Sequence, residues 1–192
     1  QRILYETELT KQQMQLLAYR NQINPHFLYN TFECIRAMAL YYDADEIAEI
    51  TMALSRIFRY SIKGENVVTV SEEIGNIREY AKIIHYRFGG RIRVDIQMEK
   101  EAEDMELIKL ILQPIVHGLE QKLEDGRVTV KAECYQETRL RFTVEDDGCG
   151  MEQEAVDKLM YQMKRQSLHR SSSKDSIGLA NIYQRLQLYY GE

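Results

Sequence analysis

A proline inside a helical pattern constrains this chain more than any other feature. Pro25 removes a backbone hydrogen bond from any helix that runs through it, and it should bend that helix. On both sides of it, apolar residues recur every three or four positions, which is typical of a packed amphipathic helix: Leu9, Leu16 and Ile23 before it, and Leu28, Phe32, Ile35 and Ala39 after it. The pattern predicts one long helix over residues 3–40, kinked near Pro25.

A histidine directly follows this proline. On an ideal helix with about 100° per residue, His26 lies roughly 150° from the centre of the second apolar stripe. Its imidazole should therefore point to solvent, where it is available for chemistry. There is an alternative: Asn24 and Pro25 cap a new helix, and His26 is then an ordinary surface residue.

The nine residues around this histidine read Gln-Ile-Asn-Pro-His-Phe-Leu-Tyr-Asn, from Gln22 to Asn30. They resemble the motif of LytS/YesM-like sensor histidine kinases, whose histidine accepts phosphate from ATP. The resemblance implies that His26 is the phospho-acceptor. Phe27 stands where many other histidine kinases have an acid, so the base for His26 is unassigned.

The resemblance also implies an α+β fold in two parts. A helical hairpin forms a dimeric four-helix bundle, and an α/β sandwich of the histidine-kinase/gyrase/chaperone ATPase type follows it. This chain stops at Glu192, where the family adds two more strands, so we expect a sandwich truncated at its C-terminus. The implied domains are residues 1–64 for dimerisation and histidine phosphotransfer, 65–90 for a linker helix, and 91–192 for ATP binding.

Composition narrows the class of protein. A length of 192 residues allows one large or two modest domains, and 44% hydrophobic with 29% charged residues is ordinary for a globular chain. A net charge of −5 argues against nucleic acid as a partner. Three cysteines without metal-site spacing read as reduced thiols. No apolar run is long enough for a membrane span, and no signal peptide opens the chain. The resemblance implies that the parent protein is a bacterial inner-membrane receptor, of which this chain is the cytoplasmic part.

A second helix should pair with the first. Asp43 followed by Glu46 resembles a capping box, and a stripe of Ile47, Ile50, Leu54, Ile57 and Ser61 continues the helical spacing. One hairpin buries its stripe poorly, and two hairpins complete a four-helix bundle. We therefore predict a homodimer, as in the family, although packing of the hairpin on its own chain is the alternative. The predicted interface consists of Leu28, Phe32, Ile35, Ile47, Ile50, Leu54 and Ile57.

The remaining residues alternate between helices and strands, which indicates an α/β sandwich. Ser71 should cap a third helix that ends at Gly89-Gly90, with a buried stripe of Ile74, Ile77, Ala81, Ile84 and Phe88. Strands are predicted at 92–96, 127–134 and 139–144, and helices at 107–119, 152–164 and 179–190. The polar segment 166–176 should be a mobile lid.

Two glycine-bearing segments are candidates for a nucleotide site. A carboxylate and glycines at the end of a strand, as in Asp146, Gly148 and Gly150, suit an adenine amine and a close backbone approach. Gly178 opens a predicted helix, whose N-terminus suits phosphate, although an ordinary turn explains either segment alone. Their order resembles the two glycine boxes of the histidine-kinase ATP-binding domain. That resemblance implies an adenine-reading Asp146, with Asp147 in place of the usual asparagine, and ATP contacts from Gly148, Gly150, Gly178, Leu179 and Asn181.

The first ATP motif of the family is incomplete. Leu112 to Val116 match it, but His117 and Gly118 follow at once. About five residues are missing, including the asparagine that holds Mg²⁺, either by a true deletion or as a stretch absent from the printed sequence. The other histidines (His85, His117 and His169) lack metal-ligand spacing, so no metal ligand is predicted. ATP and Mg²⁺ remain the cofactors that the family implies.

The predicted function is therefore a two-component sensor histidine kinase that phosphorylates His26 from ATP and passes the phosphate to an aspartate of a response regulator. The alternative is a non-catalytic dimeric signalling scaffold with a degenerate nucleotide site. A third possibility, an ATPase of the chaperone/gyrase type, does not explain the histidine motif. Because the magnesium ligand is missing, we expect His26 to be phosphorylatable but self-phosphorylation to be poor.

Overall fold

The computed structural model describes residues 24–62, 64–120, 124–136, 138–165 and 174–191. Contacts between residues divide the chain into two units, Gln1–Ser55 and Arg56–Glu192. Within the described ranges, no helix has the length and apolar character needed to cross a membrane.

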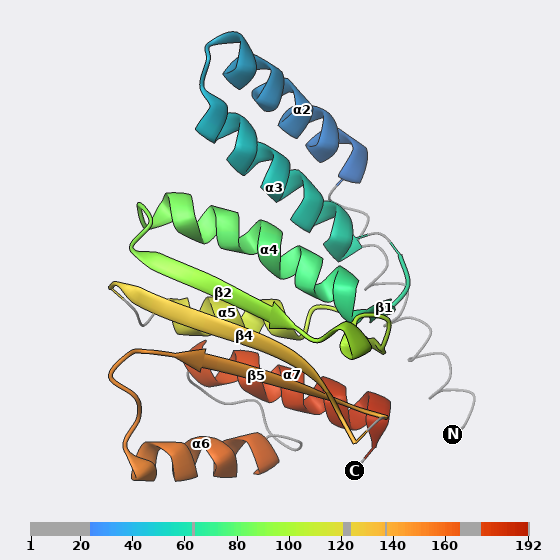
Figure 1. Ribbon diagram of the computed structural model, residues 1–192, viewed down its shortest axis with the longest axis vertical. Coiled ribbons are helices and arrows are strands. Elements are labelled where there is room, and N and C mark those ends of the chain that lie inside the picture. Colours follow the sequence, from blue (N-terminus) through green and yellow to red (C-terminus); the bar gives the residue numbers. More distant parts are fainter. Residues whose placement is uncertain (1–23, 63, 121–123, 137, 166–173, 192) are drawn as a thin grey trace, which may run out of the picture. The chain divides into compact units, whose positions relative to one another are not determined.

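The first unit contains a helical hairpin (Figure 1). Helix α2 spans Pro25–Tyr41, and helix α3 spans Asp45–Ile62, of which the residues up to Ser55 belong to this unit. Asn24 has extended backbone angles and is the N-cap of α2, with Pro25 at the first helical position. The helix therefore begins at Pro25, and the prediction of one continuous kinked helix through this proline is wrong. The part of the predicted helix at residues 3–23 lies outside the described residues.

The turn between the two helices is a Schellman motif. Asp43 has a left-handed φ of 52°. Its N–H donates to the carbonyl of Leu40 over 3.2 Å, and the N–H of Ala44 donates to the carbonyl of Ala39 over 2.8 Å. These two bonds satisfy the last carbonyls of α2. The prediction that Asp43 starts the second helix is therefore wrong, because Asp43 ends the first one.

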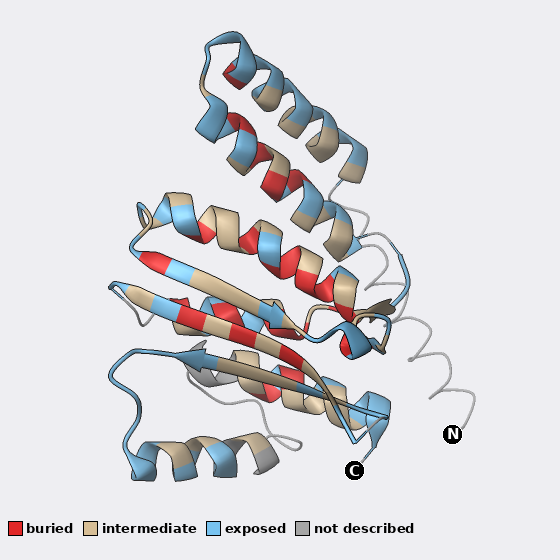
Figure 2. Cartoon of the chain, in the orientation of Figure 1, coloured by how far each residue is buried: buried red, intermediate tan, exposed pale blue. Residues whose placement is uncertain are grey.

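Figure 2 shows the buried positions of this hairpin in red, and small side chains occupy them. Several large apolar side chains of the predicted interface stay open to solvent, with exposed fractions of 41% for Ile35, 53% for Ile47 and 40% for Leu54. The buried residues are Ala39, Ala48, Thr51, Ala53 and Ser55.

The second unit is built on a three-stranded sheet. Strands β2 (Ile92–Met98), β4 (Gly126–Tyr135) and β5 (Arg139–Asp146) lie in the order β2-β4-β5, with β2 parallel and β5 antiparallel to β4. A small antiparallel pair joins β1 (Val67–Thr69) to β3 (Glu106–Ile108). The helices are α4 (Val70–Arg87), η1 (Lys100–Ala102), α5 (Leu112–Glu120), α6 (Gln153–Arg165) and α7 (Lys174–Tyr190).

Alternation along β4 shows which face of the sheet is covered. Val128, Val130 and Ala132 are buried, whereas the intervening Thr129 and Lys131 are not. One face therefore packs on helices and the other stays polar, as expected for a two-layer sandwich. The core also takes Ile74, Ile77 and Ile84 from α4, Leu112 and Val116 from α5, and Ile182 from α7. The predicted α+β fold is confirmed.

Several predicted boundaries in this unit are corrected. The N-cap of α4 is Thr69, which forms a capping box with Glu72, and not Ser71. Leu107 lies in strand β3, so α5 starts only at Leu112, with Pro114 in its first turn. Helix α7 starts at Lys174 rather than at Leu179. Most of the predicted lid, residues 166–173, lies outside the described residues.

Candidate functional site

The histidine of the motif lies exposed in the first turn of α2. The side chain of Asn24 accepts hydrogen bonds from the backbone N–H groups of His26, at 3.1 Å, and Phe27, at 3.4 Å. This cap fixes the backbone that carries the imidazole. No acidic residue lies in the first turn of α2, so no carboxylate there repels a phosphate group. The prediction that His26 faces away from the buried stripe agrees with its exposure.

Among the described residues, one side chain is hydrogen-bonded to the imidazole ring. Asn30 lies one helical turn after His26, and its Nδ2 atom is 3.3 Å from Nδ1 of His26. Thr31 is held separately, since its hydroxyl donates to the carbonyl of Phe27 over 2.8 Å. The ring nitrogen Nε2 has no hydrogen bond from the described residues and stays open to solvent.

The glycine-bearing turn after β5 is locked by two aspartates. Oδ1 of Asp147 accepts from the backbone N–H of Arg127 over 2.7 Å, and the N–H of Asp147 donates back to the carbonyl of Arg127 over 3.2 Å. Oδ1 of Asp146 accepts from the N–H of Gly148 over 2.9 Å. Gly150 has a left-handed φ of 71°, which favours glycine. Asp147 therefore has a structural use here, and Asp146 lies exposed at the end of the strand.

The second glycine segment occupies a different place from the one predicted. Gly178 is the fifth residue of α7, which starts at Lys174. Because the first four N–H groups of a helix lack intrahelical partners, those available to a phosphate belong to residues 174–177. In Figure 1 the end of β5 and the start of α7 lie at the same end of this unit. Asp146 is the last residue of β5, and Gly178, Leu179 and Asn181 lie within α7.

A buried carboxylate follows the incomplete ATP motif. Glu120 is fully buried, on the same face of α5 as Leu112 and Val116. Its Oε1 accepts from the hydroxyl of Tyr80 over 2.8 Å and lies 3.1 Å from Nη1 of Arg87 and 2.9 Å from Nδ1 of His117. The pKa of Tyr80 is raised, mainly because the residue is buried and next because its hydroxyl donates to Glu120.

This arrangement gives α5 no metal ligand. The carboxylate of Glu120 points into the core and is paired with Arg87, and its Oε2 is buried without a partner among the described residues. No group of three or more His, Cys, Asp or Glu side chains able to hold a metal ion occurs in the described ranges. The magnesium-binding asparagine of the family has no counterpart in α5, so no described residue is assigned to Mg²⁺.

A second buried carboxylate ties α3, α4 and α5 together. Glu73 of α4 is fully buried and accepts from the backbone N–H groups of Leu110, Ile111 and Leu112 over 2.8, 2.8 and 2.9 Å. The hydroxyl of Tyr60, in the last turns of α3, donates to it over 2.5 Å. Glu73 therefore caps the N-terminus of α5 from another helix.

Arg185 of α7 binds the segment just before α5, to which Glu73 also binds. Its guanidinium donates to the carbonyls of Lys109 and Leu110. Leu110 has a left-handed φ of 60°, so these bonds and those of Glu73 hold a strained backbone in place. Sequence reasoning missed both residues. The available signal was that Glu73 shares the spacing of the buried stripe of Ile77, Tyr80 and Ile84.

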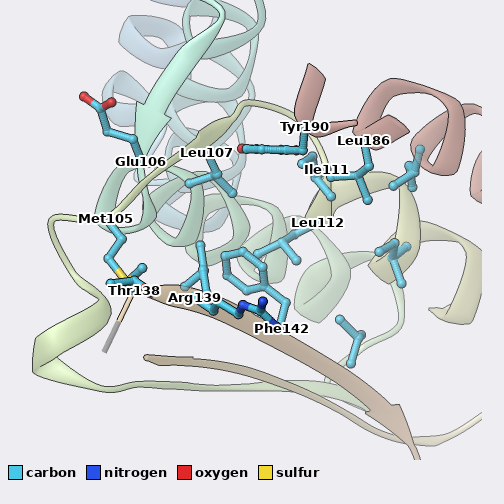
Figure 3. A pocket seen from close by; sticks show the side chains of 14 residues that line it. Met105, Glu106, Leu107, Ile111, Leu112, Thr138, Arg139, Phe142, Leu186 and Tyr190 are labelled. Atoms are coloured by element: carbon cyan, nitrogen blue, oxygen red, sulfur yellow. The ribbon is translucent and has the colours of Figure 1, made fainter. Parts of the chain in front are cut away.

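A cavity of about 710 Å³ lies between β3, β5, α5 and α7 (Figure 3). Leu107, Ile111, Phe142 and Leu186 are among its apolar lining residues, and the hydroxyl of Tyr190 accepts from the N–H of Ile108 over 3.1 Å. None of the predicted ATP residues lines it. Its lining is too apolar for a triphosphate, so it is not the candidate nucleotide site.

Comparisons with known proteins show the family of this chain. The family model described as histidine kinase matches residues 14–92, and the model described as histidine kinase-, DNA gyrase B-, and HSP90-like ATPase matches residues 102–192. The sensor protein LytS of Oceanobacillus iheyensis is 31% identical over 97% of this chain and 33% of its own length. The sensor histidine kinase YesM of Bacillus subtilis is 30% identical over 97% and 31%.

Among solved structures, the histidine kinase domain of a blue-light activated histidine kinase from Erythrobacter litoralis matches with a TM-score of 0.47 and 16% identity. That match covers 84% of this chain and 85% of the other. The two family models together match most of the chain, which belongs to the sensor histidine kinases. It spans about a third of the length of the curated relatives that it matches.

Proposed function

We propose that this chain is the phosphotransfer and ATP-binding part of a sensor histidine kinase in which His26 accepts the γ-phosphoryl group of ATP. The observation that carries the proposal is the placement of His26. It is exposed in the first turn of α2, its backbone is held by Asn24, and no acid lies beside it in that turn.

The position at the start of α2 suits the product. A phosphorylated histidine carries negative charge, and the positive end of the helix dipole stabilises an anion there. The phosphoryl group would then pass to an aspartate of a response regulator. Because the ring is open to solvent, both the donor nucleotide and the acceptor protein can reach it.

The second unit supplies the nucleotide site in this proposal. Asp146 lies at the end of β5, with its Oδ1 bonded to the N–H of Gly148 and its Oδ2 without a hydrogen bond from the described residues. It would accept from the adenine amine, while Gly148 and Gly150 allow close approach and the start of α7 faces the phosphates. Bound ATP supplies the phosphoryl group. Since no described residue is assigned to Mg²⁺, we assign no step to it.

The rest of the assignment follows the family. Residues 1–64 are proposed as the dimerisation and phosphotransfer hairpin, 65–90 as the linker helix, and 91–192 as the ATP-binding part. The hairpin pairs with a second copy of itself, and the whole protein is a membrane-anchored receptor with this part in the cytoplasm. The exposed Ile35, Ile47 and Leu54 support the homodimer.

The test is incubation with γ-labelled ATP and Mg²⁺, next to a His26→Gln variant and a His85→Gln control on the exposed His85. We expect weak labelling that His26→Gln abolishes and His85→Gln leaves unchanged. Labelling that survives in His26→Gln would overturn the assignment of the acceptor. Calorimetric titration with ATP, with and without Mg²⁺, separates the kinase from the scaffold alternative, which predicts no nucleotide binding in either condition.

A further inference from the structure

We propose that Tyr60 and Glu73 form a latch through which the end of α3 controls the start of α5, and with it the affinity of the second unit for nucleotide. The latch consists of the Tyr60 hydroxyl, the Glu73 carboxylate and residues 109–112, all of which belong to the second unit. The part that concerns nucleotide rests on the proposed function, because it takes α5 and α7 as the helices of the ATP site.

Donors occupy both oxygens of the Glu73 carboxylate. Its Oε1 accepts from the backbone N–H groups of Ile111 and Leu112. Its Oε2 accepts from the N–H of Leu110 over 2.8 Å and from the hydroxyl of Tyr60 over 2.5 Å. The direction of all four bonds is fixed, because an ionised carboxylate only accepts. Tyr60 and Leu110 share one oxygen, so Tyr60 helps to hold the atom that holds the backbone of Leu110.

The same segment also contacts the last turn of α3 directly. The buried Lys109 donates from Nζ to the carbonyl of Tyr60 over 3.4 Å. Because α3 ends at Ile62, this carbonyl is one of the last four of the helix, which lack intrahelical partners. A cation at the C-terminal end of a helix is stabilising. The end of α3 is therefore joined to residues 109–112 at two points, through Glu73 and through Lys109.

The backbone of Leu110 gives this segment a second arrangement. Its φ of 60° is left-handed, which is strained for a leucine. The strained form is held because the N–H of Leu110 donates to Glu73 and its carbonyl accepts from Nη1 of Arg185 over 2.9 Å. A change to negative φ relieves the strain and turns at least one of these groups away from its partner. Weakening the bond to Glu73 therefore shifts the segment toward the relaxed form.

This segment is tied to both helices of the proposed nucleotide site. Helix α5 begins at Leu112, which is also the first residue of the incomplete ATP motif. Arg185 lies in α7, about two turns after Gly178, and holds the carbonyls of Lys109 and Leu110. When Leu110 relaxes, the spacing between α5 and α7 is less well fixed. Nucleotide must then also order this segment, which weakens its binding.

Helix α3 connects the latch to the hairpin. It is one helix, Asp45–Ile62, whose residues up to Ser55 belong to the first unit. A change in the hairpin that unwinds the end of α3 withdraws the hydroxyl and the carbonyl of Tyr60 together. Residues 109–112 are then held less firmly and nucleotide binds more weakly. Coupling between two sites is reciprocal, so bound nucleotide in turn stabilises the end of α3.

The first test measures amide hydrogen exchange of the whole chain without nucleotide. Tyr60→Phe removes the hydroxyl of the latch. Tyr80→Phe is the matched control, because it removes the same group from its bond to another buried carboxylate, that of Glu120 at the other end of α5. A general loss of stability affects both variants alike. We expect the amides of residues 110–112 to exchange about two- to tenfold faster in Tyr60→Phe than in Tyr80→Phe, the factor expected for one hydrogen bond. Equal rates in the two variants would overturn the latch.

The second test is calorimetric titration with ADP, which has no γ-phosphoryl group to transfer. We expect Tyr60→Phe to raise the Kd for ADP about two- to tenfold and Tyr80→Phe to leave it unchanged. An unchanged Kd in Tyr60→Phe would overturn the control of nucleotide affinity by α3. Absence of ADP binding by the wild type would overturn the proposed function together with this control, whereas the exchange rates alone decide whether the latch exists.

Discussion

The hairpin and the α/β unit bury opposite kinds of side chain. In the hairpin, Ala39, Ala48 and Ala53 are buried, while Ile35 and Ile47 stay open to solvent. In the second unit, branched aliphatic side chains are fully buried between sheet and helices, among them Ile74, Ile77, Leu112, Val128 and Val130.

This difference indicates how each unit reaches stability. The second unit closes a core of its own, in which even the charged Glu73 and Glu120 find partners. In the hairpin the buried residues are small, and the large apolar side chains gain nothing until another surface covers them. In the proposed homodimer, a second hairpin provides such a surface.

The largest expected effect is on the stability of the proposed dimer. Ile35→Asp should cost little in a single hairpin, because Ile35 is 41% exposed there. In a symmetric dimer it buries two unpaired charges, at a cost of roughly 5 kcal/mol or more in total, which weakens the dimer over a thousandfold. Sedimentation equilibrium at micromolar concentrations should show monomers.

Leu40→Asp is the matched control for this prediction. Leu40 is also exposed, at 47%, but it lies about 140° around the helix from Ile35. It should leave the dimer intact. Monomeric wild-type protein would support the alternative in which the hairpin packs on its own chain.

The next largest effect is expected in the α/β unit. Glu73→Ala leaves three backbone N–H groups at the start of α5 without their acceptor, and should lower the free energy of unfolding by about 3–5 kcal/mol. The neighbouring Glu72 takes part only in the capping box of α4, so Glu72→Ala should cost about 1 kcal/mol. Urea unfolding of both variants measures the difference. Equal losses would show that Glu73 is merely another helix-cap residue.

Sequence patterns predicted the elements better than their ends. Periodicity depends on which face of an element is buried, so the stripe of Ile74, Ile77 and Ile84 and the alternation of Val128 and Val130 were both readable. Boundaries depend on individual hydrogen bonds. Asp43 fits a helix start in sequence, yet its left-handed backbone ends the preceding helix. The sequence alone does not choose between Thr69 and Ser71 as the N-cap. The structure does, because Glu72 forms a capping box with Thr69.

The candidate site also has features that were predictable from sequence and features that were not. The exposed position of His26 followed from helical spacing alone. The roles of Glu73 and Glu120 did not, because each carboxylate is satisfied by groups from other segments, 37 to 40 residues away in the case of Leu110 and Tyr80. Only the tertiary structure brings such partners together. The lid was predicted over 166–176; its last three residues lie in α7, and the rest of it, like the roles of the ATP residues, remains a prediction.

A smaller effect, on rate rather than on folding, should come from restoring the incomplete motif. Inserting Glu-Asn-Ala and two further residues between Val116 and His117 returns the family's magnesium ligand. We expect self-phosphorylation on His26 to rise at least about a hundredfold, which corresponds to about 2.7 kcal/mol. The same insertion with alanine in place of the asparagine is the control and should gain little. Full-rate labelling of the chain without the insertion would contradict this prediction.

The smallest expected effect is the loss of one hydroxyl group, compared between the two units. Tyr60 lies in the part of α3 that belongs to the second unit. Its hydroxyl donates to buried Glu73, so Tyr60→Phe should cost about 1 kcal/mol of unfolding free energy, whereas Tyr41→Phe, at a residue that is 80% exposed, should cost nothing measurable.

Burial, then the charge of Glu73, raises the pKa of Tyr60 above its ordinary value of 10.0. A raised pKa means that the folded state holds this proton more tightly than the unfolded chain does. The stability that Tyr60 contributes is therefore fully present below pH 10.0 and declines as the pH rises beyond it. Urea unfolding of wild type and Tyr60→Phe at pH 8 and at about pH 11 should show the difference between them shrinking at the higher pH. A difference that stays constant would mean that the hydroxyl is not held by Glu73 in solution.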